Sequence, residues 1–314
     1  MKKISILLCI LFILQLTIPL YSCNVDGEKE GDYITFTDST GEMVYLDARP
    51  TRVAVLFSSF AEAWILAGGD IYVTVGESVE RGFAEDSVLL VDSGAGKTVN
   101  TELLISYEPD LVILSADIPA HLECAKALKT ADIPCALMRI ESLDDYLYAL
   151  KTFTDITDRP DLYEKNGTYV KNRVISILES VKACDGKPKI LFIRAGSTYR
   201  SVKAKSSDNN FVCKMLEDLN AYNIADNAPL LLDGISEEEI IRENPDFIFI
   251  SLMGDEGASY ANMKSILSSD AYKSLDAVKN GRCHYLPKNM FQYKPNEKWA
   301  DAYLYLAEIL YESK

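Results

Sequence analysis

The chain has 314 residues, and its 47 Asp and Glu residues against 32 Lys and Arg residues give a formal net charge of −15 at pH 7. A chain this acidic is unsuited to the phosphate backbone of nucleic acid, so we expect no nucleic-acid partner. Hydrophobic residues make up 48% of the sequence, and the length suffices for one large core or for two lobes of ordinary domain size.

The first 22 residues have the features of a secretion signal. Lys2 and Lys3 precede the apolar run 4–20, which is short for a membrane span and contains polar interruptions. The residues Leu20-Tyr21-Ser22-Cys23 resemble a bacterial lipobox, in which the cysteine becomes the lipidated first residue. We therefore expect a lipoprotein signal at 1–22, a lipid on Cys23 and a polar tether at 23–32. Ordinary cleavage nearby, or an uncleaved anchor, is the alternative.

The first half of the remaining chain alternates apolar runs with amphipathic segments, which predicts strands and helices of a parallel sheet. A hairpin comes first, because the turn residues 38–41 separate two short strand-like segments. Residues 77–98 are expected to be rich in loops. The expected elements are strands 33–37 and 43–46, strand 52–57, helix 59–67, strand 71–75, strand 111–114, helix 119–130, strand 135–138 and helix 143–153.

A long helix is predicted over residues 161–183. Pro160 suits a first helical turn, and Gly186 with Pro188 ends the helical pattern. At about 1.5 Å per residue the helix would be roughly 35 Å long. Gly167 is its weakest position, costing up to about 1 kcal/mol relative to Ala. One apolar stripe at a spacing near 3.6 is formed by Tyr163, Val170, Val174, Leu178 and Val181.

The second half repeats the first. Residues 102–115 and 238–251 match at an offset of 136, and each consists of a short amphipathic helix, a Pro-Asp turn and an all-apolar run. A run that is apolar on both faces is typical of a parallel strand covered on both sides. The expected elements are strand 189–194, a polar loop 195–208, helix 210–219, helix 236–243, strand 247–251, helix 260–268, strand 283–286 and helix 297–312.

The repeat predicts two similar α/β lobes joined by the long helix itself. The expected boundaries are an N-terminal lobe at 33–158, the connecting helix at 159–186 and a C-terminal lobe at 187–314.

One loop of the second half concentrates positive charge in this acidic chain. It follows strand 189–194, and ligands of open α/β sheets bind beyond the carboxyl ends of strands. An anionic ligand would suit the loop; the alternative is a solvated surface loop. Tyr293 and Trp299 could add an aromatic wall, although packing in the core is an equal alternative for Trp299. The candidate ligand-binding residues are Arg194, Tyr199, Arg200, Lys203, Lys205, Tyr293 and Trp299.

Catalytic and metal-binding motifs are weak in this sequence. Gly94–Thr98 lacks the first glycine of a P-loop, because position 91 is Val, and no G-x-S-x-G is present. The two histidines, His121 and His284, do not lie in a tight set of ligands. We expect no catalytic residue, no metal site and no cofactor. Five cysteines are expected to be small buried hydrophobes, with one unassigned disulfide left open: Cys124, Cys135, Cys184, Cys213 and Cys283.

Taken in order, several segments resemble the substrate-binding lipoproteins of bacterial ABC importers, in the class that carries ferric siderophores, haem or cobalamin. These segments are the lipobox, the run from Asp38 to Val53, the segment Glu102 to Ile113, the long helix, and Lys294 to Trp299. The resemblance covers nearly all of the mature chain. It implies an α/β fold with two Rossmann-like lobes and parallel-rich sheets, joined by one long α-helix that limits closure over a cleft.

The resemblance also implies partners. Members of this class dock onto arginines of a permease dimer, which works with an ATPase, through one surface glutamate per lobe. Glu102 and Glu238 stand seven residues before the proline of each Pro-Asp pair and are the matching positions. The expected function is delivery of an anionic metal chelate, such as a ferric siderophore, by a protein anchored outside the cytoplasm. Haem or cobalamin binding, an exported α/β enzyme, and a sensor or adhesin are the alternatives.

Overall fold

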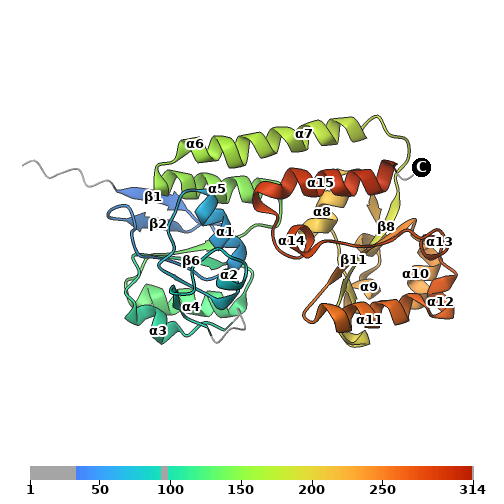
Figure 1. The fold of residues 1–314 in the computed structure, drawn as a ribbon, viewed down its shortest axis with the longest axis horizontal. Helices are drawn as coiled ribbons and strands as arrows, with labels where there is room; N and C mark the ends of the chain where they lie inside the picture. Colours follow the sequence, from blue (N-terminus) through green and yellow to red (C-terminus); the bar gives the residue numbers. More distant parts are fainter. Residues whose placement is uncertain (1–32, 93–97, 313–314) are drawn as a thin grey trace, which may run out of the picture.

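A computed structural model describes residues 33–92 and 98–312 and shows two α/β lobes beside a layer of long helices (Figure 1). Each lobe is built on a sheet of parallel strands. In the N-terminal lobe the spatial order is β5 (Leu89–Leu90), β4 (Val73–Thr74), β3 (Val53–Val55), β6 (Leu111–Ser115) and β7 (Cys135–Met138). In the C-terminal lobe it is β10 (Tyr222–Asn223), β8 (Lys189–Ala195), β11 (Phe247–Leu252) and β12 (Cys283–Tyr285), with β9 (Lys203–Ala204) antiparallel to β8.

The sheets confirm the predicted repeat. When β5 and β9 are set aside, each sheet has four strands in the same spatial order. Numbered along the chain within each sheet, that order is second, first, third and fourth. The Pro-Asp turn has the same structural task in each lobe. Asp110 accepts backbone N–H bonds from Thr51 and Arg52 at 2.9 Å, and Asp246 accepts one from Lys189 at 2.8 Å. Each aspartate therefore ties the start of one strand to the start of its neighbour.

Most expected elements form within a few residues of their predicted bounds, because their apolar runs and caps are strong. The hairpin strands are β1 (Ile34–Thr37) and β2 (Met43–Leu46). The helices of the N-terminal lobe are α1 (Ser58–Leu66), α2 (Gly76–Glu80), α3 (Thr101–Ser106), α4 (Pro119–Thr130) and α5 (Leu143–Thr157). Those that follow β8 are α8 (Phe211–Asp218), α9 (Pro229–Asp233), α10 (Glu237–Glu243), α11 (Glu256–Leu267), α12 (Asp270–Lys273), α13 (Asp276–Lys279), α14 (Lys288–Phe291) and α15 (Trp299–Ala307).

Three differences from the expected elements are instructive. The stretch 77–98 contains the end of α2 and the strand β5, and the polar loop 195–208 contains β9. β5 and β9 have two residues each, too few to produce a periodic pattern. Helix α11 begins at Glu256, four residues before the predicted start, because the side chain of Asp255 caps it by accepting the N–H of Ala258 at 3.0 Å.

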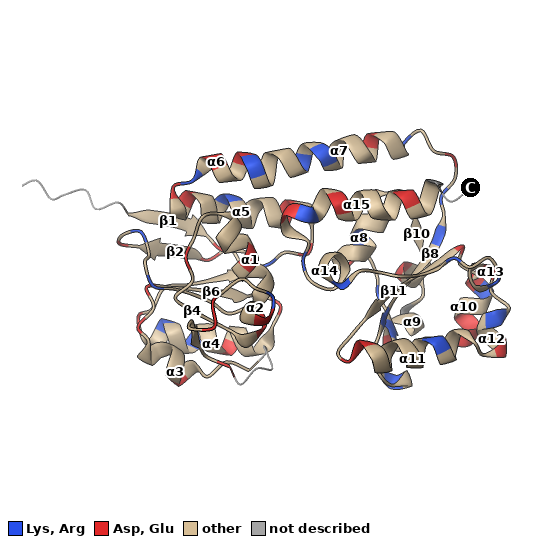
Figure 2. Ribbon diagram, in the orientation of Figure 1, with Lys and Arg blue, Asp and Glu red and all other residues tan. Residues whose placement is uncertain are grey.

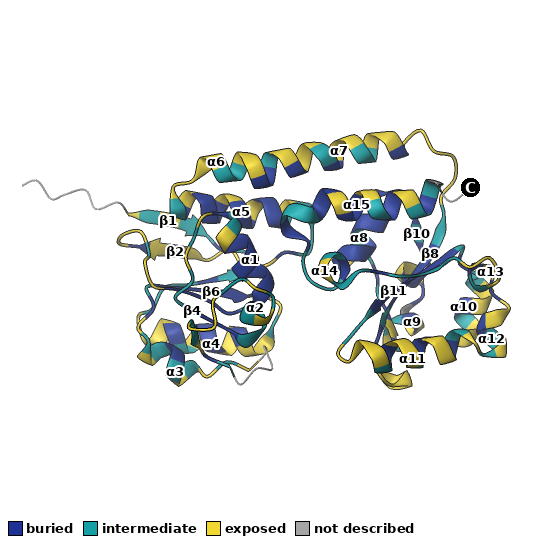
Figure 3. Cartoon of the chain, viewed as in Figure 1, coloured by how far each residue is buried: buried dark blue, intermediate teal, exposed yellow. Residues whose placement is uncertain are grey.

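The connecting helix runs from residue 160 to residue 181 in three pieces. They are α6 (Pro160–Tyr163), a π-helical turn η1 (Glu164–Thr168) and α7 (Tyr169–Val181). The predicted apolar stripe is the side of the helix that packs inward, and Figure 3 shows the outer side exposed. Gly167 lies in the π turn and is buried against Leu150 of α5, so the close approach of two helices explains a residue that weakens an isolated helix.

The two lobes share one hydrophobic core through the helical layer. α15 packs along α7 (Figure 1), and Arg173 of α7 donates to Asp301 of α15 at 2.8 Å. A single cluster of buried residues continues from β3 and α1 through α5, α7 and α15 to α8 and β8. The segment 292–298, predicted within the C-terminal lobe, bonds to α1 of the N-terminal lobe through Asn296. The lobes are thus joined by α15 as well as by the predicted helix, and the predicted domain boundaries stay a proposal.

Candidate ligand-binding site

The candidate site lies where strands of the two lobes end close together. Arg194 lies near the carboxyl end of β8, and Glu141 follows β7 of the other lobe. The Glu141 carboxylate opposes the burial that lowers the pKa of Arg194, so the two strand ends are within electrostatic reach. This arrangement matches the general rule that open parallel sheets bind ligands at their carboxyl edge.

Arg194 is held without a carboxylate partner. Its Nε and Nη2 atoms contact the Sδ atom of Met253 at 3.3 and 2.8 Å, and within the described residues it forms no ion pair. Burial lowers the pKa of Arg194, and Glu141 opposes that effect. Because a thioether sulfur is only a weak acceptor, most of the hydrogen-bonding capacity of the guanidinium is unused.

The short strand β9 places two lysines beside Arg194. Lys203 lies directly opposite Arg194 in the antiparallel register, and Lys205 follows it. Like charges facing each other across two strands destabilise the pairing. Burial lowers the pKa of Lys205, and the positive charges of Arg194 and Lys203 lower it further. The fold therefore concentrates positive charge where an anion would offset it.

Lys294 completes this cationic cluster, which we define as Arg194, Lys203, Lys205 and Lys294. Its Nζ lies 4.6 Å from the ring centroid of Phe211 and donates to the Glu141 carboxylate. Its side chain is only 11% exposed, against 39% for Glu141. Burial lowers the pKa of Lys294, and Glu141 opposes this by favouring the charged amine. Lys294 lies in the family-like segment from Lys294 to Trp299, and no local sequence pattern marks it as a site residue.

A second network supports the segment that carries Lys294. The guanidinium of Arg81 lies 3.9 Å from the ring centroid of Tyr293 and 4.6 Å from that of Phe83. Its Nη2 donates to Glu62 at 3.1 Å. Burial raises the pKa of Glu62, repulsion from Glu297 raises it further, and Arg81 lowers it. One face of Tyr293 is therefore already covered by Arg81.

The remaining candidates are placed differently. Tyr199 is 52% exposed and donates to the Ile235 carbonyl at 3.3 Å. Arg200 is exposed and forms no ion pair within the described residues. Trp299 is 0% exposed and packs edge-on against Phe211 at 5.9 Å. Trp299 is therefore packed in the core, which favours the alternative of core packing over an aromatic wall for this residue. Its large apolar ring is buried between α15 and α8.

The two expected docking glutamates occupy equivalent and exposed places. Glu102 lies in the first turn of α3, and Glu238 lies in the first turn of α10. Their helices are capped in the same way, by Asn100 and Ser236, whose side chains accept from the residue three positions on. Figure 2 shows acidic residues on both helices, and in this view both helices lie on the side of their lobe away from α7. Neither carboxylate has an ion-pair partner among the described residues.

Metal-ligating side chains are scattered. In the ranges 33–92 and 98–312, no group of three or more His, Cys, Asp or Glu residues is arranged to hold a metal ion. The five cysteines in these ranges are free, and Cys184 is exposed, which corrects the expectation that all are buried. None of the described helices combines the length and the apolar character that a membrane crossing requires. The proposed lipidation residue Cys23, the tether and residues 94–97 lie outside the described residues.

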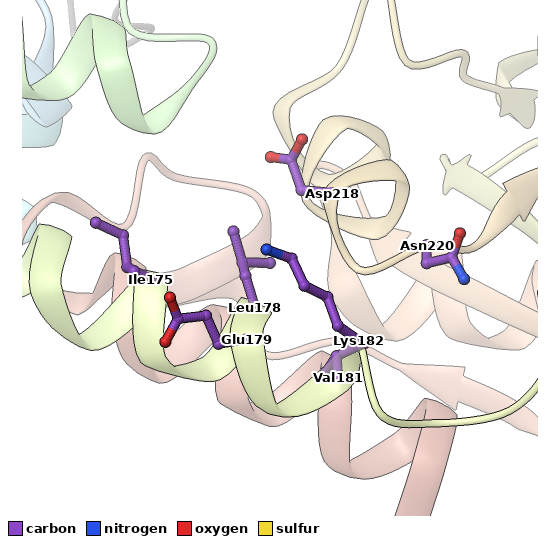
Figure 4. Close-up of a pocket in the computed structure, with 7 residues that line it drawn as sticks. All are labelled: Ile175, Leu178, Glu179, Val181, Lys182, Asp218 and Asn220. Atoms are coloured by element: carbon purple, nitrogen blue, oxygen red, sulfur yellow. The ribbon is translucent and has the colours of Figure 1, made fainter.

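A cavity of about 510 Å³ lies along the connecting helix (Figure 4). It is bounded by Leu178, Lys182 and other residues of α7 on one side, and by Asp218 and Asn220 at the end of α8 on the other. None of the residues that line it belongs to the cationic cluster. This cavity is therefore separate from the candidate site.

The chain belongs to the periplasmic binding protein family, whose model matches residues 53–290. This finding confirms the predicted class. Comparison with curated protein sequences found no match.

Solved structures of the same fold include proteins that bind haem and siderophores. The haem-binding protein RhuT from Roseiflexus sp. RS-1 is 17% identical, with 83% of this chain and 98% of that chain covered and a TM-score of 0.68. IsdE of S. aureus, complexed with haem, is 14% identical, with 83% and 99% covered and a TM-score of 0.68. The siderophore-binding protein BauB, bound to two acinetobactin molecules and ferric iron, is 16% identical, with 88% and 98% covered and a TM-score of 0.69.

Proposed function

We propose that this protein is a lipid-anchored solute-binding protein that delivers an anionic metal chelate, most simply a ferric siderophore or related iron chelate, to an ABC importer. The observation that carries the proposal is the half-buried Arg194, which contacts the sulfur of Met253, forms no ion pair within the described residues and lies beside two lysines. Two solved structures with the same fold hold haem and a ferric siderophore complex, which supports the same class of ligand.

The repulsion among the four cations of the cluster supports a negatively charged ligand. Glu141 is the carboxylate that raises the pKa of three of them, Arg194, Lys205 and Lys294. Arg194, Lys205 and Lys294 are partly buried and Lys203 is exposed, and positive charges that lie together at reduced exposure repel each other. A ligand that carries several negative charges would relieve this repulsion and form charge-assisted hydrogen bonds, which are the stronger kind.

Haem or cobalamin is the close alternative, and an exported α/β enzyme, or a sensor or adhesin on the same scaffold, is the alternative of another class. Both histidines are poorly placed as haem ligands. His121 is buried, and the His284 ring stacks 5.8 Å from that of Phe249. The family consists of binding proteins, and we infer that this member binds its ligand without transforming it.

Transport would require two further contacts. We infer that Glu102 and Glu238 dock the two lobes onto a permease dimer with its ATPase, and that a lipid on Cys23 holds the protein at the membrane outside the cytoplasm. One acyl chain gives only marginal binding, so a stable anchor needs a second signal. Release of a Cys23→Ala variant from the membrane fraction, or failure of its signal to be cleaved, is the expected behaviour of this anchor.

The proposed ligand class is tested by titration of the purified protein with ferric catecholate, ferric hydroxamate and ferric citrate complexes, haem and cobalamin. Quenching of Trp64 and Trp299 fluorescence is the measurement. At least one anionic iron chelate should bind, and Arg194→Ala should weaken binding about tenfold or more, because a hydrogen bond to a charged group contributes about 1.5–3 kcal/mol. Arg200→Ala, which changes an exposed residue of the same loop, is the comparison. Unchanged affinity in both variants would move the site elsewhere.

A further inference from the structure

Glu141 lies within the cationic cluster and bonds to one of its members. It projects from the N-terminal lobe three residues beyond β7, and its backbone N–H is fixed by Asp145 Oδ2 at 2.9 Å. Its carboxylate accepts a hydrogen bond from Lys294, a residue 153 positions further along the chain. The carboxylate therefore bridges two parts of the chain that local sequence does not hold together.

More cations than carboxylates lie around Glu141. Its negative charge raises the pKa of each of three cations, Arg194, Lys205 and Lys294. The other carboxylate that acts on Lys294 is that of Asp117, and it is already bonded to Arg139 Nε at 2.8 Å. One carboxylate thus faces several cations, and the charge of the cluster is only partly compensated.

The exposures of the two partners show which can move. The side chain of Lys294 is 11% exposed and lies over the Phe211 ring, whereas that of Glu141 is 39% exposed. Rotation of the Glu141 side chain into solvent would therefore sacrifice less burial than movement of Lys294. A carboxylate held in this way stands where an anionic group of a ligand would bind.

We propose that Glu141 is a resident anion that the ligand must displace from Lys294, so that it lowers the affinity for every ligand and selects for highly anionic ones. The inference rests on the proposed function and deepens it. A ligand gains the contact with Lys294 only after the contact with Glu141 is lost, so the net gain is a difference between two ion pairs. A ligand with little negative charge cannot offset the loss and is rejected.

The test uses isothermal titration of the full mature protein with citrate, a tricarboxylate, and separately with ferric citrate, at constant ionic strength. Glu141→Gln removes the competing charge and keeps the shape of the side chain. It should lower the citrate Kd about tenfold. Glu42→Gln is the matched control, because Glu42 is also ion-paired to a lysine, Lys129, on the surface of the same lobe; it should leave the Kd unchanged.

A second variant separates displacement from other roles of Glu141. If Glu141 acts through Lys294, Glu141→Gln should give no gain in a Lys294→Met background whose folding is verified by its melting temperature. Weaker citrate binding by Glu141→Gln would mean that Glu141 contacts the ligand directly, and an unchanged Kd would mean a structural role only. Either result overturns the inference, as does citrate binding by neither wild type nor Glu141→Gln.

The two probes also separate this inference from the proposed function. If Glu141→Gln tightens citrate binding while no iron chelate binds, the resident anion stands and the proposed ligand class fails. If iron chelates bind but Glu141→Gln has no effect on either probe, the proposed function stands and the resident anion is rejected.

Discussion

At the scale of single residues, this protein buries several ionisable groups at a cost that its site explains only in part. Under the proposed function, Arg194 and Lys294 would be compensated by the incoming anion. His121 has no such compensation. Its Nδ1 accepts the N–H of Ser115 at 3.0 Å, while its buried Nε2 has no hydrogen-bond partner among the described residues, and burial lowers its pKa to about 4. His121 is thus a group whose protonation the fold opposes.

The buried imidazole predicts acid sensitivity. The folded-state pKa lies below the usual value of 6.5, so between about pH 6.5 and pH 4 the unfolded chain binds the extra proton and stability falls as pH falls. The full effect is about 3 kcal/mol. Urea unfolding at pH 7 and pH 4.5 should show a larger loss of unfolding free energy in the wild type than in His121→Gln. Equal losses in both proteins would contradict this assignment.

Residue-scale function was only partly predictable. Arg194 is a candidate because it follows a strong apolar strand, and its two lysine neighbours lie in the same loop; their role in binding stays a prediction. Lys294 and Glu141 were missed because their contact joins positions 153 residues apart, and no local pattern records it. Trp299 could be assigned to the core only after α15 was seen to pack on α8 and α7.

At the scale of elements, α1 shows how one glycine fixes the packing of a buried helix. The helix ends before Gly68 and Gly69, and the Trp64 indole returns over this turn to donate to the Asp70 carbonyl at 2.8 Å. A Cβ atom on Gly69 would lie 2.0 Å from Trp64 Cε2. The chain can therefore pass close to the indole ring only where a side chain is absent.

Gly69→Ala should lower the free energy of unfolding by about 3 kcal/mol or more, because Trp64 must leave its position in the core. Gly257→Ala is the matched control: it lies in α11, and its nearest neighbour would be Asp255 Oδ1 at 3.4 Å. That variant should change the free energy by less than about 1 kcal/mol. Chemical denaturation of the three proteins measures both effects. A Gly69→Ala protein as stable as the wild type would show that Trp64 is not constrained by this turn.

Elements with long periodic patterns were predicted well, and short ones were not. The stripe of α7 and the apolar runs of β6 and β11 each specify a buried surface, so the pattern and the structure agree. β9 consists of two residues and forms because Ala204 pairs with Ile193 of β8. At Gly167, in the π turn, a Cβ atom would meet Tyr163 of the same helix at 3.1 Å and Leu150 of α5 at 3.2 Å, a crowding that no local pattern predicts.

At the scale of the whole molecule, two similar lobes present matched acidic residues. Glu102 and Glu238 are exposed in equivalent first turns, and a carboxylate there also favours its helix dipole by about 0.3–1 kcal/mol. A structural role of this size would leave transport unchanged. In a docking role, loss of the two acids would reduce transport, because two matched acids fit a permease partner with two-fold symmetry.

The double variant Glu102→Arg with Glu238→Arg should keep its ligand affinity and lose transport, because attraction at the interface becomes repulsion. Uptake of the bound chelate by cells that carry the importer is the measurement. Glu164→Arg with Glu179→Arg, two exposed residues of the connecting helix, makes the same change of charge on another face and should transport normally. Wild-type uptake by the first variant, with the protein folded and anchored, would rule out docking through these residues.

The central claim is that an anionic iron chelate binds between the lobes on the cationic cluster. Anomalous diffraction at the iron edge, from crystals grown with the chelate that binds in titration, tests it most directly. The account predicts one iron peak near the carboxyl end of β8, with ligand oxygens within hydrogen-bonding distance of Arg194 and Lys294. An iron peak elsewhere on the molecule, with Lys294 still bonded to Glu141 and Arg194 still on Met253, would contradict it.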